Sequence, residues 1–120
     1  MKMMKKRGII VLVIALASAL LLTSCANIEN GEDCQIYDAK LEVKSARTGV
    51  ITAVLKNTSS EMQTYRIRYD LYDSEDNYLG IATTITDIFG GSEATIAIRL
   101  PENINCYDVK RIELANASHD

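Results

Sequence analysis

The residues of this chain that could carry nucleophilic or metal-binding chemistry are three cysteines and one histidine. The histidine, His119, stands next to the last residue, where chains are usually poorly ordered. Serines and threonines are plentiful, but no histidine or lysine is arranged to activate one of them as a nucleophile. We therefore expect no enzyme, no catalytic residue and no cofactor. The chemistry that remains belongs to Cys25, Cys34 and Cys106.

Cys25 follows a segment with the composition of an export signal. The apolar residues 9–22, interrupted only by Ser18, come after a basic head made of Lys2, Lys5, Lys6 and Arg7. As a helix, this apolar run would span about 21 Å, which is less than the roughly 30 Å hydrocarbon core of a bilayer. The segment therefore predicts a helical signal peptide over residues 1–24.

The end of this segment resembles the bacterial lipobox, in which a branched apolar residue and two small residues precede an obligate cysteine. The matching residues are Leu22, Thr23, Ser24 and Cys25. The resemblance implies that Cys25 is acylated and becomes the first residue of the mature chain, anchored in the lipid bilayer. The alternative is an uncleaved helix over residues 8–26. Both interpretations place the rest of the chain outside the cytoplasmic membrane, as a membrane-anchored extracytoplasmic protein.

The charge of the chain changes when the signal peptide is removed. Four of the 13 basic residues lie in residues 1–24, so nine remain against 16 acidic residues, a formal charge of −7. An acidic surface argues against nucleic acid and against a domain that lies flat on anionic lipid. No small-molecule substrate is evident. The polar residues 25–33, which include Gly31, predict a short flexible stalk before the folded part.

Residues 34–116 alternate apolar and polar side chains with period two, as half-buried strands do. In the clearest strand the expected inward row is Tyr65, Ile67, Tyr69 and Leu71, and the outward row is Thr64, Arg66, Arg68, Asp70 and Tyr72. The other expected inward rows are Tyr37, Ala39, Leu41 and Val43; Ile51, Ala53 and Leu55; Leu79, Ile81, Thr83 and Ile85; and Ala94, Ile96, Ile98 and Leu100. The last strand keeps one apolar face only with a bulge at Lys110 and Arg111.

Turn-forming residues separate these strands and leave no room for helices. The pattern predicts an all-β domain over residues 34–116, a small Ig-like antiparallel β-sandwich of six or seven strands, followed by a tail over 117–120. The two remaining cysteines precede the first and the last strand, and such strands commonly lie side by side. We therefore expect a disulfide between Cys34 and Cys106, worth about 4 to 5 kcal/mol. Two buried free thiols are the alternative, and a metal pair lacks further ligands.

Residues 49–100 also resemble the FxLYD domain family. The naming motif stands here as Tyr69-Asp70-Leu71-Tyr72-Asp73, with tyrosine in place of the leading phenylalanine. The match continues in order with "LKNTSS" before it and with "YDSEDNYLG" and "ATIAIRL" after it, although "FGGSE" lacks the proline of the family's turn. The resemblance implies an Ig-like β-sandwich typical of bacterial and archaeal exported proteins and lipoproteins. It implies no activity, catalytic residue or cofactor.

Two candidate sites remain on this framework. The outward residues Arg66, Arg68 and Tyr72 are of types enriched at protein interfaces, although a solvated face balanced by acidic neighbours would look the same. The turn over residues 73–77 gathers oxygen ligands as calcium loops do, but Tyr78 stands where an EF-hand needs glycine. We therefore expect no metal site and an ordinary acidic hairpin.

Two hypotheses about function follow. The first is a tethered module that binds a protein or peptide partner at the cell envelope through a sheet face or an edge strand. The second is a structural or accessory envelope lipoprotein, a spacer or complex subunit without its own ligand.

Overall fold

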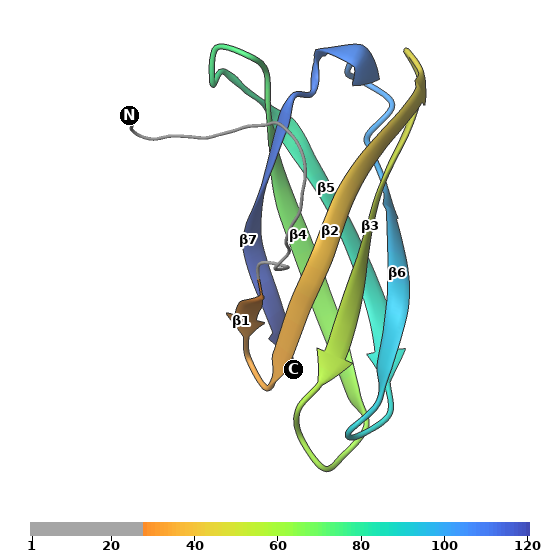
Figure 1. Cartoon of the computed structure of the whole chain (residues 1–120), viewed down its shortest axis with the longest axis vertical. Helices are drawn as coiled ribbons and strands as arrows, with labels where there is room; N and C mark the ends of the chain where they lie inside the picture. Colours follow the sequence, from red (N-terminus) through yellow and green to blue (C-terminus); the bar gives the residue numbers. More distant parts are fainter. Residues whose placement is uncertain (1–27) are drawn as a thin grey trace, which may run out of the picture.

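A computed structural model describes residues 28–120 of the chain (Figure 1). The predicted signal peptide, the lipobox residues and the acylation of Cys25 lie outside the described residues. The predicted flexible stalk is wrong for residues 29–31, because these form a short strand, β1 (Glu29–Gly31), paired with the strand that begins at Cys34.

The described residues form two antiparallel sheets, which confirms the predicted all-β sandwich. The first sheet has the order β1-β2-β3-β6, and its longer members are β2 (Cys34–Ser45), β3 (Thr48–Asn57) and β6 (Glu93–Arg99). The second sheet has the order β5-β4-β7, with β4 (Gln63–Tyr72), β5 (Tyr78–Ile88) and β7 (Arg111–His119). A single 3-10 turn, η1 (Cys106–Asp108), precedes β7. Figure 1 shows the sheets as two layers, with β2, β3 and β6 in front of β4 and β5.

The inward row of β4 forms one wall of the core. Tyr65, Ile67, Tyr69 and Leu71 are all buried, as the alternation predicts. They meet buried residues of the opposite sheet, which include Ile36, Ile51, Leu55 and Ile98. Burial of each such side chain stabilises the fold by about 1.5 to 3 kcal/mol. This row fixes which side chains of β4 face outward.

The predicted inward row of β5 is wrong from Ile81 onward. The buried residues of β5 are Ala82 and Ile88, whereas Ile81 and Ile85 are 38% and 58% exposed. Leu71 pairs with Gly80 and Tyr72 with Tyr78, so one extra residue lies in β5 at this point. Because side chains alternate with period two, such a bulge reverses which face each later residue occupies. Two isoleucines therefore lie on the outside of the sandwich.

The predicted disulfide is also wrong, because Cys34 and Cys106 are both buried free thiols. Cys34 begins β2, while the backbone N–H of Cys106 donates to the carbonyl of Ala46, just beyond the other end of β2 (2.8 Å). A strand of this length spans about 36 Å, and a disulfide requires Cα atoms within about 7 Å. The two strands that follow these cysteines run in opposite directions, so their beginnings lie at opposite ends of the sandwich.

The C-terminal strand differs from the prediction in two ways. β7 begins at Arg111, and its bulge lies at Ala115, between the pairs Arg68 with Asn116 and Tyr69 with Leu114, not at Lys110 and Arg111. The expected tail over 117–120 belongs to β7 as far as His119. The end of the chain is thereby part of the folded domain.

Candidate binding surface

The three interface residues predicted from the sequence lie together on the outer face of the β5-β4-β7 sheet. Arg66, Arg68 and Tyr72 alternate with the buried row of β4, so their side chains leave the core. Ile85 of β5 lies directly opposite Arg66, and Ile81 lies opposite Asp70. We call the surface formed by Arg66, Arg68, Tyr72, Ile81 and Ile85 the arginine–isoleucine face.

Within residues 28–120 each of the two arginines pairs with one carboxylate, that of Asp120, which is 75% exposed, and that of Asp70, which is 19% exposed. Arg66 lies 3.4 Å from a carboxylate oxygen of Asp120, and Arg68 lies 3.1 Å from one of Asp70. Side-chain exposures of 55% for Arg66 and 46% for Arg68 leave both guanidinium groups in contact with solvent. An exposed pair such as Arg66–Asp120 is worth about 0 to 1 kcal/mol, so a partner can displace it at small cost.

Tyr72 is held at one end of this face. The guanidinium carbon of Arg111 lies 4.1 Å from the centre of the Tyr72 ring, and the ring of Tyr78 meets it edge-on at 6.0 Å. Arg111 also pairs with Asp76 of the β4–β5 turn at 3.0 Å. Partial burial, together with the carboxylate of Glu113, raises the pKa of Tyr72. Its hydroxyl therefore stays neutral near pH 7, and its ring is fixed in place.

The sequence analysis missed the apolar part of this surface. Ile81 and Ile85 were assigned to the core, because isoleucine at alternate positions is typical of a buried row. Beyond them, Phe89 and Met62 are also exposed, and the pairing of Gln63 with Ile88 places these two side by side at the end of the same sheet. One feature of the sequence could have indicated the correct register of β5. Ala82, Thr84 and Thr86 form a second alternating row, and their small side chains are suited to face a thin core.

The turn between β4 and β5 uses its oxygen atoms internally. The carboxylate of Asp73 accepts hydrogen bonds from the backbone N–H groups of Glu75 (2.8 Å) and Asn77 (2.9 Å) and from the Asn77 side chain (3.1 Å). Hydrogen bonds from Asn77 are the main cause that lowers the pKa of Asp73. Among residues 28–120 there is no cluster of His, Cys, Asp or Glu that could hold a metal ion. The carboxylate of Asp73 fixes the hairpin.

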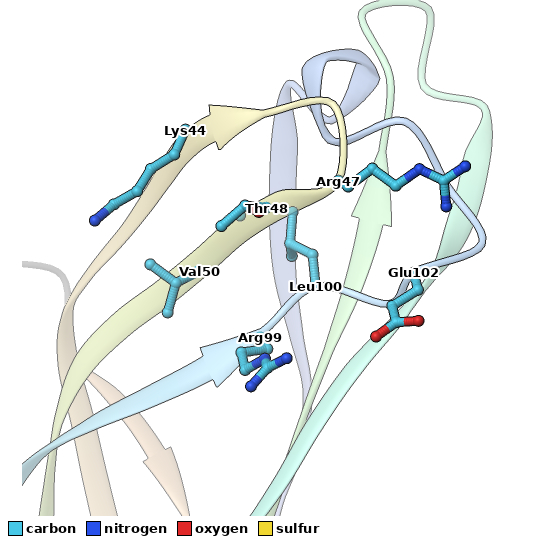
Figure 2. Close-up of a pocket in the computed structure, with 8 residues that line it drawn as sticks. Lys44, Arg47, Thr48, Val50, Arg99, Leu100 and Glu102 are labelled. Carbon is cyan, nitrogen blue, oxygen red and sulfur yellow. The ribbon is translucent and has the colours of Figure 1, made fainter.

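A basic hollow of about 330 Å³ lies at the end of the sandwich where β2 turns into β3 (Figure 2). Lys44, Arg47 and Arg99 line it together with Glu102. Within residues 28–120 none of these three cations forms an ion pair. Figure 2 shows Lys44 and Arg47 pointing away from each other, with Arg99 lower between them. The positive groups are therefore dispersed over the hollow and do not converge on one point.

His119 has a structural position that the sequence did not predict. Its Nε2 lies 2.8 Å from a carboxylate oxygen of Asp33, and its ring meets that of Tyr65 edge-on. The hydroxyl of Tyr65 donates to the carbonyl of Asp33 at 2.6 Å. A hydrogen bond with the Asp120 backbone and the side chain of Asp33 raise the pKa of His119. The histidine joins the end of β7 to the β1–β2 turn.

The part of the chain from residue 28 to residue 120 contains no helix that is long and apolar enough to cross a membrane. No protein-family model, no curated protein and no solved structure matches the chain. The resemblance to the FxLYD family therefore rests on the sequence motif alone.

Proposed function

We propose that this chain is an extracytoplasmic lipoprotein, anchored in the membrane by acylated Cys25, whose sandwich binds a protein or peptide partner at the cell envelope. The lipobox after a basic and apolar segment supports the anchor. The resemblance of residues 49–100 to FxLYD domains supports the same setting. The acidic charge of the mature chain fits a domain that stands off an anionic membrane surface.

One observation carries the binding role. Ile81 and Ile85 are large apolar side chains on the outside of a strand at the edge of its sheet, with Ile85 opposite Arg66 and Ile81 opposite Asp70. Protein interfaces typically combine apolar residues with arginine and tyrosine. An edge strand also offers backbone groups to an added strand. The arginine–isoleucine face therefore combines apolar contact area with charged groups that can orient a partner.

The second candidate is an accessory lipoprotein without a ligand of its own. The observation that favours it is that Arg66 and Arg68 already pair with Asp120 and Asp70. A solvated sheet face would be arranged in the same way. The two candidates predict different contacts: only a binding module should contact a partner through the arginine–isoleucine face.

A pull-down from cross-linked membranes separates them. The full-length protein is compared with an Arg66→Glu/Arg68→Glu/Ile85→Thr variant of the arginine–isoleucine face. A Lys44→Glu/Lys56→Glu variant carries the same charge change on the other sheet and serves as the control. A partner recovered by wild type and control but lost by the face variant supports the binding role. Recovery of the same proteins by all three would contradict it.

A further inference from the structure

β6 is an edge strand without the features that usually protect an edge. Within residues 28–120 it pairs with β3 on one side and with no strand on the other. Figure 1 shows it at the outer margin of the front layer. Natural edges are protected by shortness, bulges, proline or charges in the middle of the strand. β6 has seven residues and no proline, it is neutral between its two ends, and its register with β3 contains no bulge.

The other edge strands of the two sheets each carry one of these protections. β1 has only three residues. β5 is bulged next to the pair of Tyr72 with Tyr78, and β7 is bulged at Ala115. Among the four edges of the described sandwich, β6 alone is both long and regular. An unprotected edge of this kind is suited to pairing with another strand.

Every second residue of β6 directs its backbone N–H and C=O groups away from the sheet. The N–H of Leu100 donates to the carbonyl of Gly49 at 3.0 Å, and the N–H of Asn57 donates to the carbonyl of Ser92 at 2.9 Å. In a regular antiparallel ladder the residues at even steps from these bond to the same neighbour, and those between them point the other way. The residues with outward backbone groups are therefore Glu93, Thr95, Ala97 and Arg99.

The two ends of β6 carry opposite charges on the outer face of the sheet. Arg99 lies opposite the apolar Val50 of β3 and forms no ion pair within residues 28–120. Glu93 accepts a hydrogen bond from the hydroxyl of Tyr37 at 2.6 Å, which holds its carboxylate on this face. It also forms no ion pair there, although Lys56 lies opposite it. Each end of the strand can therefore pair with the opposite charge on another chain.

We propose that β6 pairs antiparallel with β6 of a second copy of this chain, about a two-fold axis at Ile96. Glu93 then lies opposite Arg99 of the second copy, and Thr95 lies opposite Ala97. Of the antiparallel registers that match outward backbone groups, this one alone pairs all four residues and both charges. The two-fold axis makes the opposite-charge pair occur twice. The arginine–isoleucine face lies on the other sheet, and this inference does not rest on the proposed function.

Sedimentation equilibrium of the full-length protein in a density-matched detergent measures the association. Glu93→Arg and Arg99→Glu each turn both charge pairs into like-charge contacts, so each should weaken dimerisation at least roughly tenfold. The double variant Glu93→Arg/Arg99→Glu exchanges the charges and should return to within about threefold of wild type. Lys110→Glu makes the same charge change as Arg99→Glu outside β6 and should have no effect.

Three results of this experiment would overturn the proposal. The first is a wild type that stays monomeric at protein concentrations up to roughly 0.5 mM. The second is a dimer that neither single variant weakens. The third is a double variant that dimerises no better than the single variants, because the register requires the exchanged charges to meet again.

Amide hydrogen exchange, followed by NMR of the ¹⁵N-labelled full-length protein, tests whether β6 itself forms the contact. The outward amides of Thr95 and Ala97 gain hydrogen bonds only in the dimer, so their exchange should slow at least roughly tenfold as the protein concentration rises through the dissociation constant. The amide of Ile96 faces β3 and is the internal control, protected at every concentration. In Arg99→Glu the same rise in concentration should produce no such slowing. A dimer in which Thr95 and Ala97 stay unprotected would overturn the proposal.

Discussion

Tyr65 and Tyr69 occupy equivalent places on the inward side of β4, and both are almost completely buried. The hydroxyl of Tyr65 donates to the carbonyl of Asp33 at 2.6 Å, whereas that of Tyr69 is unpaired. Around Tyr65, the β1–β2 turn and the end of β7 are held together by hydrogen bonds. Around Tyr69, a bulge of β2 leaves a cavity. Equal burial therefore does not mean an equal role: one tyrosine closes the sandwich, and the other lines an opening in it.

The largest loss of stability is expected from a change at Asn57, at the end of the sandwich that Tyr65 closes. This residue is fully buried, and its side-chain amide donates to the carbonyls of Glu61 (2.8 Å) and Ile88 (2.9 Å). Its side-chain oxygen accepts from the backbone of Ser59. Asn57→Ala should lower the free energy of unfolding by about 2 to 4 kcal/mol, because several buried groups lose their partners. Urea denaturation measures this, and a loss below about 1 kcal/mol would contradict it.

The next effect is that of Tyr65→Phe, which keeps the ring and removes the hydrogen bond to Asp33. The carbonyl of Asp33 then loses one of its two donors and keeps the backbone N–H of Thr58 (3.0 Å). We expect the free energy of unfolding to fall by about 1 to 2 kcal/mol. An unchanged urea midpoint would show that solvent replaces the hydroxyl and that this end is not closed.

Tyr69→Phe is the matched change at the cavity. Because its hydroxyl has no partner in the folded protein, removal should leave the free energy of unfolding unchanged or raise it by up to about 1 kcal/mol. The difference between the two tyrosine variants, measured under the same conditions, is the sharpest form of the comparison. Equal losses of unfolding free energy for Tyr65→Phe and Tyr69→Phe would contradict the difference between the two tyrosines.

A smaller, pH-dependent effect is expected from His119. Its pKa is raised above the ordinary 6.5 by hydrogen bonds with Asp120 and Asp33, so the protonated form is favoured in the folded state. The stabilisation is complete below the unfolded pKa and is lost as the pH rises through the folded pKa. The melting temperature of wild type minus that of His119→Gln should fall as the pH rises from below 6.5 through the raised pKa of the folded state. A difference that is constant or rises with pH would contradict this assignment.

These features differ in how far the sequence reveals them. The register of β4 could be predicted, because its apolar row alternates with charged residues that can only face solvent. The register of β5 could not, because isoleucine and threonine occur on both of its faces and a bulge near Leu79 changes the phase. The order of the strands along the chain predicts a disulfide between the two thiols. β2 and β7 run in opposite directions, however, so the thiols lie at opposite ends of the sandwich. Nothing in the sequence distinguishes Tyr65 from Tyr69, because the difference lies in contacts with distant segments.

Site-specific photo-cross-linking tests the central claim, that the arginine–isoleucine face binds a partner, most directly. A benzophenone amino acid replaces Ile85 in the full-length protein in intact cells. The same amino acid at Lys56, on the outer face of the other sheet, is the control. We predict a discrete adduct of higher mass from position 85 that is absent from position 56 and that is lost when Arg66→Glu/Arg68→Glu is added. No adduct from position 85, or the same adducts from both positions, would contradict the account.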